Sequence, residues 1–280
     1  MRCSGAATCV LLGAAIIASG CASSAVTKAK VSRDLSGVVS SAGVDAARSA
    51  LLVVRLADKA EWRSGGERIE RPYPPASTAK IPHTLIALET GYAKGPEAFF
   101  RWDGQARQFV VWNQDHTLAS AYRHSAVWVY QQIARDIGHE AMSEWLEKFR
   151  YGNARIGSPE KLTSYWLLGP LETSVRDQVE FLSALAMNAL PLAPRTMRVG
   201  KQIMLAEAGE NWKLYAKSGW RMDGVNTDIG WYVGWVDQRD HDGLHTCVFA
   251  FNMDMSEAAD RARRQLVVRS ALRQLGVAVN

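Results

Sequence analysis

The sequence predicts an α+β fold: an antiparallel β-sheet flanked by N- and C-terminal helices, with an all-helical insertion subdomain between its two β segments. Three observations predict it. Short β-branched and aromatic segments occur near both ends of the chain, the middle has helical patterns, and the last stretch is amphipathic. Hydrophobic residues make up 48% of the 280 residues, which is enough for a packed core, and no repeat or linker separates consecutive domains.

The first residues have the pattern of a secretory signal peptide. Arg2 gives a basic start, residues 10–18 form an apolar run too short to span a bilayer, and small residues follow. We therefore assign residues 1–25 to a signal peptide and residues 26–280 to a single domain. Such a signal directs a bacterial protein across the inner membrane, so we expect the protein in the periplasm.

Two alternatives for signal cleavage stay open. Cleavage after Ala22 or Ala25 would release the domain, whereas residues 18–21 resemble a lipoprotein box in which Cys21 becomes a lipid-modified N-terminus anchored to a membrane. In either case Cys247 keeps at most one cysteine partner, so we expect no disulfide framework.

The strands are predicted from segments that are short and rich in residues that favour β-structure. Asp242-Gly243 separates the last two segments and is a hairpin turn signal. Strands this close in sequence pair antiparallel. The predicted strands are residues 51–56, 211–217, 230–236 and 246–253. The sheet part of the domain then comprises residues 26–70 and 208–280, and residues 71–207 are mainly helical.

The helices are predicted from apolar periodicity and from glycine or proline stops. Pro82 lies near the start of the first helix, so its first turn should be tight or 3₁₀-like. Tyr151-Gly152-Asn153 fits a helix stop with Gly152 as the left-handed cap. In the last helix, one face carries Leu266, Val268, Leu272 and Leu275, and the other side carries most of Arg263, Arg264, Arg269 and Arg273. The predicted helices are residues 77–90, 120–137, 140–149, 174–189 and 256–275.

Composition and missing motifs exclude several classes of function. Lys+Arg 33 against Asp+Glu 28 leaves a net charge of +5 that is spread along the chain, which argues against a nucleic-acid partner. No nucleotide-binding glycine loop, His-Glu-x-x-His or Gly-x-Ser-x-Gly motif occurs. His241, His245 and Cys247 surround a predicted turn and suit a solvated hairpin, so we expect no metal site.

The sharpest local signal is Ser77-Thr78-Ala79-Lys80, which follows two prolines. Ser77 lies where a helix can begin, and Lys80 projects from the same face about one turn later. A serine hydroxyl becomes a nucleophile when a base removes its proton, and the N–H groups at a helix start can stabilise an oxyanion. Taken alone, the pair also suits a capping serine followed by a solvent-facing lysine.

Further motifs follow this one in order. Ser125-Ala126-Val127 comes next, and Lys217-Ser218-Gly219 lies on a predicted strand. The order Ser-x-x-Lys, Ser-x-x, Lys-(Thr/Ser)-Gly is typical of penicillin-recognising serine acyltransferases. From about Ala76 to the C-terminal helix the chain resembles a class D, oxacillinase-type β-lactamase, which implies the serine β-lactamase/penicillin-binding transpeptidase-like fold. Other segments that carry the resemblance are residues 151–153, 166–170, 230–235 and 251–254.

The resemblance implies that β-lactams acylate Ser77 and that Lys80 is an N6-carboxylysine, formed with carbon dioxide, which serves as general base for acylation and deacylation. The indole N–H of Trp166 would donate a hydrogen bond to the carbamate. Lys80 must first lose its proton, which requires apolar surroundings that lower a pKa of about 10.4. Val127 and Leu167 are candidates for that lining. No metal or organic cofactor is implied.

The resemblance also implies roles for the remaining groups. Ser125 would pass a proton to the departing β-lactam nitrogen. The backbone N–H groups of Ser77 and Trp220 would form the oxyanion hole. Lys217, Ser218 and the adjoining Gly219 would bind the substrate on the strand side.

An arginine of the last helix is expected to pair with the substrate carboxylate. Arg264 falls where the resembled family carries this residue. Arg261 and Arg263 crowd the same turn, so a change of one residue in the preceding loop would exchange them. The assignment among these three therefore stays open.

Two rival functions share the motifs. A β-lactam sensor or a penicillin-binding protein is acylated without efficient turnover. A sensor needs transmembrane helices, which this sequence does not predict, and Trp166 with an apolar Val127 lining has no obvious use in a peptidase. We expect β-lactam substrates, no nucleic acid, and a monomer or homodimer; the substrate spectrum stays open.

Overall fold

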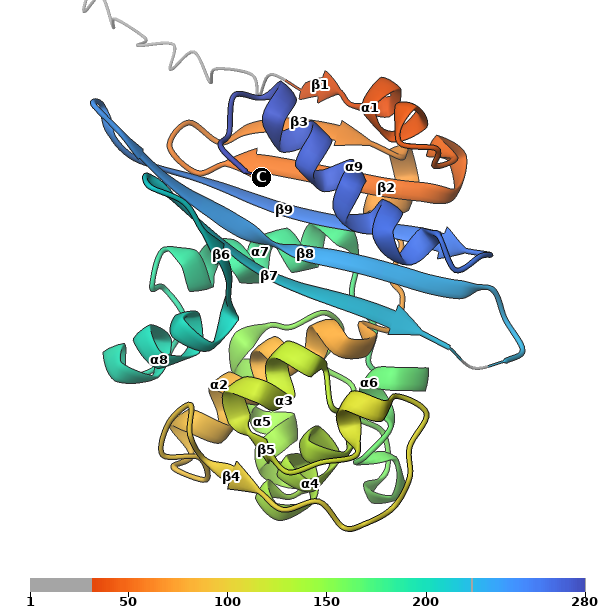
Figure 1. Ribbon diagram of the computed structural model, residues 1–280, viewed down its shortest axis with the longest axis vertical. Coiled ribbons are helices and arrows are strands. Elements are labelled where there is room, and N and C mark those ends of the chain that lie inside the picture. The colour runs from red at the N-terminus through yellow and green to blue at the C-terminus, as the bar shows by residue number, and fades with distance from the viewer. Residues whose placement is uncertain (1–31, 223, 280) are drawn as a thin grey trace, which may run out of the picture.

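The computed structural model describes residues 32–222 and 224–279. The predicted signal peptide of residues 1–25 and the possible lipid anchor at Cys21 therefore lie outside the described residues. The described chain forms one large sheet with helices on both faces and a helical subdomain packed beside it (Figure 1). The α+β prediction is confirmed.

The large sheet has seven strands in the order β1-β3-β2-β9-β8-β7-β6. Their bounds are β1 (Ser32–Asp34), β2 (Ser49–Arg55), β3 (Ala60–Ser64), β6 (Leu205–Ala208), β7 (Trp212–Arg221), β8 (Asp228–Asp240) and β9 (Gly243–Met255). Every neighbouring pair is antiparallel except β1 with β3. All four predicted strand segments lie in this sheet, whereas β1, β3 and β6 were not predicted because each is too short to show a pattern. A separate pair joins β4 (Phe99–Phe100) and β5 (His116–Thr117).

The hairpin between β8 and β9 confirms the turn predicted at Asp242-Gly243, with Asp240 opposite Gly243 in the register. Side chains alternate between the two faces of the sheet. In β2, Leu52 packs with the helical subdomain, and Val53 packs with the terminal helices. Trp231 and Trp235 of β8 are both fully buried in the core.

The terminal helices α1 (Ser36–Ser41) and α9 (Asp260–Gln274) cover one face of the sheet (Figure 1). One residue of the predicted apolar face of α9 was wrong. Leu266 is 45% exposed, and Val267 is buried together with Val268. Arg264, predicted on the polar side, lies on the buried face because it is three residues before Val267. The C-terminal helix therefore carries an arginine inward toward the strands.

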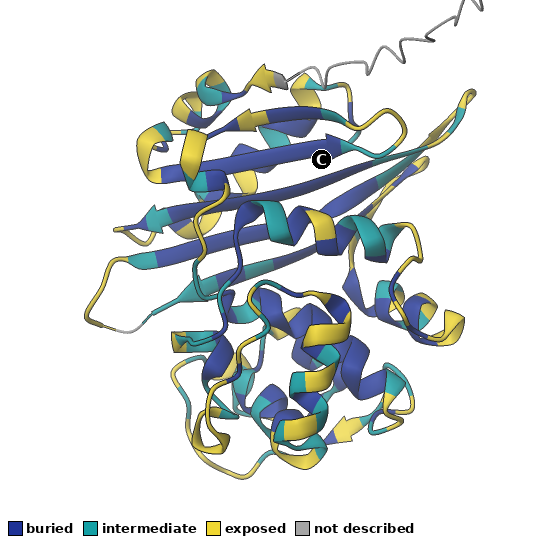
Figure 2. Cartoon of the chain, turned by 180° about the vertical axis from the view of Figure 1, so that it is seen from behind, coloured by how far each residue is buried: buried dark blue, intermediate teal, exposed yellow. Residues whose placement is uncertain are grey.

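The opposite face of the sheet is covered by α7, which crosses the buried central strands in the view from behind (Figure 2). The middle of the chain forms the helical subdomain beside it. The bounds of α7 and of the other helices in this part of the chain are α2 (Lys80–Glu89), α3 (Leu118–His124), α4 (Val127–Ile137), α5 (His139–Phe149), α6 (Tyr165–Leu168), α7 (Val175–Ala186) and α8 (Pro194–Met204). No helix among residues 32–222 and 224–279 is both long and apolar enough to cross a membrane.

The single helix predicted for residues 120–137 was wrong, because the structure divides it into α3 and α4. Ser125 ends α3 in the left-handed conformation, with a φ of 59°. An α-helix cannot continue through such a residue, and for a residue with a Cβ this conformation is uncommon and is found at functional sites. The break places Ser125 between the two helices, where its N–H still donates to carbonyls of the last turn of α3.

Candidate active site

A cavity of about 450 Å³ lies between the helical subdomain and β7. Most of the site residues predicted from the sequence line it, and three of them, Lys80, Trp166 and Lys217, lie buried behind its walls. The predicted residues that line it are Ser77, Ser125, Val127, Leu167, Ser218, Gly219, Trp220 and Arg264. Residues far apart in the chain are thus gathered around one cavity.

Ser77 and Lys80 lie where two helical forms meet. A 3₁₀-helix over Ala76–Ala79 carries Ser77, and Lys80 begins α2. The tight first turn predicted from Pro82 is confirmed, and Pro82 is the third residue of α2, where a helix needs no N–H donor. The Nζ of Lys80 lies 2.9 Å from the Oγ of Ser77, which is hydrogen-bond distance.

The Lys80 side chain is fully buried. Burial is the main reason that its pKa falls well below the ordinary value for lysine, and the charge of Lys217 lowers it further. The ring of Tyr130, which sequence reasoning missed, lies 5.1 Å from Nζ. This setting favours the uncharged amine of Lys80, the form in which a lysine can accept a proton from a neighbouring hydroxyl.

The turn that carries Ser77 is held against the sheet by its backbone. Trp231 of β8 donates from Nε1 to the carbonyl of Pro74 at 3.0 Å. A Cβ at Gly219 would lie 2.9 Å from the carbonyl oxygen of Pro75, so only glycine lets β7 approach this closely. Strand β6 pairs with β7 only as far as Tyr215. The part of β7 after Tyr215 is therefore not covered by β6, and it lies beside the cavity.

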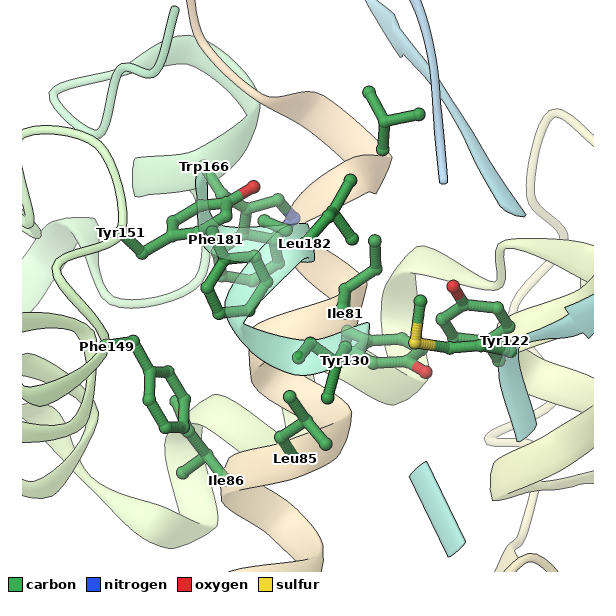
Figure 3. Close-up of a cluster of buried hydrophobic side chains, with 14 of the residues drawn as sticks. Ile81, Leu85, Ile86, Tyr122, Tyr130, Phe149, Tyr151, Trp166, Phe181 and Leu182 are labelled. Atoms are coloured by element: carbon green, nitrogen blue, oxygen red, sulfur yellow. The ribbon is translucent and has the colours of Figure 1, made fainter. Parts of the chain in front are cut away.

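Ser125 and Trp166 complete the helical side. The Oγ of Ser125 and the Nε1 of Trp166 are both buried, and neither finds a hydrogen-bond partner in the described part of the chain. Buried polar atoms are nearly always paired. One of these two atoms belongs to a residue that lines the cavity and the other to the neighbour of Leu167, which also lines it, so they indicate a site prepared for a bound group. Figure 3 shows Trp166 in the aromatic core around α2, together with Tyr130, Tyr151 and Phe181.

The sheet side of the cavity is cationic. Lys217 of β7 is 5% exposed, and burial, with the charge of Arg264, lowers its pKa to about 7. Its Nζ donates to the carbonyl of Ser218 at 2.9 Å. Arg264 is 7% exposed and donates to the carbonyl of Gly219, and burial lowers its pKa to about 10. Arg264 thus stays positively charged near neutral pH and Lys217 titrates there, in a setting that would favour an anion.

The structure separates the three arginines of the α9 turn. Arg261 and Arg264 line the cavity, whereas Arg263 points elsewhere and pairs with Glu257 and Asp260. The guanidinium of Arg261 lies 4.1 Å from the ring centroid of Trp220. Of the three arginines considered as partners of the substrate carboxylate, Arg261 and Arg264 therefore remain candidates.

The predicted left-handed cap at Gly152 was wrong, because α5 ends at Phe149 and the cap that follows it is Arg150, which has a φ of 51°. Gly152 serves a close approach instead: a Cβ there would lie 2.1 Å from the carbonyl oxygen of Glu172. The Tyr151 hydroxyl accepts a hydrogen bond from Gln178, which also donates to Thr78 in the Ser77 turn. The motif that follows α5 thus supports the turn of the predicted nucleophile.

The described Cys247 is buried and free. The predicted histidine hairpin is exposed at its turn, where Asp240, His241 and Asp242 lie together. Neither feature adds a group to the cavity.

Comparisons with known proteins show which proteins this chain resembles in sequence and fold. A profile of the penicillin-binding protein transpeptidase domain matches residues 50–273. The chain is 40% identical to β-lactamase OXA-48 of Klebsiella pneumoniae over 208 residues, which are 74% of this chain and 76% of that protein. It is 40% identical to β-lactamase OXA-2 of Salmonella typhimurium over 222 residues, or 79% and 77% of the two chains. The structure of the class D β-lactamase YbXI from Nostoc superposes with a TM-score of 0.82 at 37% identity, covering 87% of this chain and 99% of that one.

Proposed function

The chain belongs to the class D β-lactamases, and from this premise we propose that it hydrolyses β-lactams through an acyl-enzyme on Ser77. The observation that supports the nucleophile most directly is the 2.9 Å contact between its Oγ and the Nζ of a fully buried Lys80. Only an uncharged amine, or a base formed from it, can take the serine proton there.

In acylation, the Oγ of Ser77 attacks the β-lactam carbonyl carbon while its proton moves to the base at Lys80. The developing oxyanion accepts from the backbone N–H groups of Ser77, second in its helix, and Trp220. The carbon–nitrogen bond of the ring then breaks, and Ser125 passes a proton to the departing nitrogen. The left-handed backbone at Ser125 keeps its Oγ available for this transfer.

For deacylation we propose that Lys80 is an N6-carboxylysine. When present, the carbamate supplies a carboxylate-like general base that can activate water, and carbon dioxide or bicarbonate is the only small molecule it requires. The local residues fit this group, because the Nε1 of Trp166 is a buried donor that no described acceptor satisfies. Val127 and Leu167 limit the access of bulk water from the cavity side.

Substrate binding falls to the sheet side of the cavity. Lys217 and Arg264 provide the field that attracts the substrate carboxylate, and the Ser218 hydroxyl can donate to the same group. A carboxylate bound there would relieve the mutual repulsion that contributes to the lowered pKa of Lys217. We further propose that the protein works in the periplasm as a monomer or homodimer, with Cys21 as its lipid anchor if the lipoprotein box is used.

The test is the hydrolysis of nitrocefin by the purified protein with and without added bicarbonate, together with intact-protein mass spectrometry after exposure to penicillin. We expect rapid turnover that bicarbonate stimulates and, in the Ser77→Ala variant, no covalent adduct. Labelling that persists in this variant would exclude Ser77 as the nucleophile. A stable adduct without turnover would instead identify an acylated sensor or penicillin-binding protein.

A further inference from the structure

His83 lies one turn after Lys80 on α2 and is fully buried. Its Nε2 is 2.7 Å from the hydroxyl of Tyr165, the residue immediately before Trp166. The rings of His83 and Trp166 meet edge to face, with centroids 4.7 Å apart and planes at 86°. His83 therefore contacts both residues that begin α6. It lies on the same helix as Lys80, the residue toward which the Trp166 indole would have to point.

The hydrogen bond between His83 and Tyr165 is between neutral groups. Burial is the main reason that the pKa of His83 falls to about 3, and a proton on Lys80 would lower it as well; burial raises the pKa of the Tyr165 hydroxyl well above its ordinary value. With the hydroxyl as donor and Nε2 as acceptor, only Nδ1–H is left without a partner in the described chain. The opposite direction would leave both the phenol proton and the Nδ1 lone pair unpaired, so the first arrangement is favoured.

The segment that carries Trp166 needs such an anchor. The α6 helix has only four residues, which is too short for its own hydrogen bonds to orient a large side chain. Tyr165 packs edge to face on Trp166 with centroids 5.0 Å apart, and its hydroxyl is tied to α2 through His83. The carbonyl of Tyr165 also accepts from the N–H of Leu171, which fixes the chain after the turn.

We propose that His83 and Tyr165 form a positioning pair that locks α6 to α2 and so directs the Trp166 indole N–H at the Lys80 side chain. The proposal rests on the proposed carbamate at Lys80, since that is the group the indole would stabilise. Neither residue takes part in proton transfer: the pair acts only through the position of Trp166. Its loss should weaken the carbamate while leaving the Ser77 turn and the carboxylate site on β7 in place.

Three variants isolate the pair. Tyr165→Phe keeps the ring against Trp166 and removes the hydroxyl, His83→Leu removes the acceptor at similar volume, and the third variant combines both changes. Thr84→Val is the matched control, because it breaks another buried hydrogen bond of α2, the 2.8 Å contact between Thr84 and Tyr130. A general loss of packing should affect the control as much as the test variants.

Two measurements are made on each folded variant: the bicarbonate concentration that gives half-maximal turnover, and the occupancy of the carbamate by ¹³C NMR with labelled bicarbonate. Tyr165→Phe and His83→Leu should each raise the bicarbonate concentration for half-maximal turnover about tenfold and lower the carbamate occupancy accordingly. A change of this size is within the range expected when one buried hydrogen bond is lost and its partner is left unpaired. The double variant should be no weaker than either single variant, because the two residues act as one unit. Thr84→Val should stay within about twofold of the wild type.

The outcomes separate the two proposals. If the wild-type protein shows neither a carbamate signal nor a bicarbonate response, the carbamate proposal fails and the positioning role fails with it. If the wild type shows both, but Tyr165→Phe and His83→Leu match Thr84→Val, only the positioning pair is overturned. Additive losses in the double variant would likewise overturn it, since two independent contacts would then be at work. If His83→Leu does not fold, the comparison of Tyr165→Phe with Thr84→Val still decides.

Discussion

The cavity has two walls of opposite character. The helical wall is formed by Ser77, Lys80, Ser125 and Trp166. Burial lowers the pKa of its lysine, and its polar groups, except for the Ser77–Lys80 contact, lack partners among the described residues. The sheet wall, formed by residues 217–220 and Arg264, presents two cations that are already bonded to strand carbonyls. Both walls are buried, so burial alone does not explain the difference.

The difference follows from what surrounds each cation. The amine of Lys80 is enclosed by aromatic and aliphatic groups and contacts a hydroxyl, so its charged form has little to stabilise it. Lys217 and Arg264 are buried too, which lowers their pKa values to about 7 and about 10, but each donates to a carbonyl oxygen, a contact that favours a charged donor. One wall thus favours an unprotonated lysine amine, which the proposed carbamate requires for its formation, and the other is suited to holding an anion.

The largest effect is expected from removing the unpaired donor of the helical wall. Trp166→Phe keeps an aromatic ring but removes the indole N–H, so the general base should be lost and deacylation should slow about 100-fold, with a smaller effect on acylation. Trp235→Phe is the control, because Trp235 is also fully buried with a Nε1 that has no partner among the described residues, yet it stacks on Tyr215 in the core.

Pre-steady-state kinetics with a chromogenic β-lactam separates the two steps of this prediction. Accumulation of acyl-enzyme in Trp166→Phe but not in Trp235→Phe is expected. Equal slowing in both variants would mean that the Trp166 indole contributes only to packing. It would contradict the role of the helical wall in supporting the general base.

The sheet wall is tested by comparing two arginines of one helix turn. Arg264→Ala should raise KM for a penicillin about 10- to 100-fold with a smaller change in kcat, because a charge-assisted hydrogen bond to the substrate carboxylate is worth about 1.5–3 kcal/mol. Arg263→Ala should leave KM nearly unchanged, since Arg263 pairs with Glu257 and Asp260 instead. Steady-state kinetics decides, and a larger effect of Arg263→Ala would reverse the assignment.

Much of this arrangement follows from local sequence. The spacing of Ser77 and Lys80 and the β-branched strand segments are local patterns. The structure has the start of a helix at the first and strands of the large sheet at the others. A feature whose residues are close in sequence can be predicted from their spacing, and this spacing can be read from one sequence alone.

What the sequence could not show depends on contacts between distant segments. The helical pattern continues through Ser125, and its left-handed conformation is set by the surrounding tertiary structure. His83 is one turn after Lys80, a spacing that placed it on the same face, but its partner Tyr165 is 82 residues away. Arg264 was assigned to the wrong side of α9 because a weakly amphipathic helix tolerates a shift of one residue.

A pH prediction sharpens the contrast between the lysines. In the folded protein Lys217 has a pKa of about 7, whereas unfolding returns it to about 10.5. Between these values the unfolded chain binds a proton that the folded chain does not, so Lys217 makes the free energy of unfolding rise with pH by up to about 1.4 kcal/mol per pH unit. Below pH 7 its full cost to stability is present, and above pH 10.5 it is gone.

Lys217→Met should therefore flatten this dependence. Urea unfolding at pH 7.5 and pH 9.0 should show a gain with pH that is about 1–2 kcal/mol smaller than in the wild type. Lys213→Met, at an exposed position of the same strand, is the control and should retain the wild-type gain. An unchanged slope in Lys217→Met would mean that this lysine stays protonated in the folded protein throughout the range.

The smallest effect is expected where the two walls meet. Arg261 lies 4.1 Å from the ring centroid of Trp220 on the sheet wall and 5.9 Å from that of Phe109 in the helical subdomain. Cation–π contacts of exposed groups contribute about 0.5–1 kcal/mol, so Arg261→Ala should raise KM about two- to fivefold for a penicillin with a bulky aromatic side chain. A penicillin with a small side chain would not reach these rings and should be nearly unaffected. Equal changes for both substrates would show that Arg261 acts on their shared carboxylate, and the sheet wall would then hold its anion with two arginines.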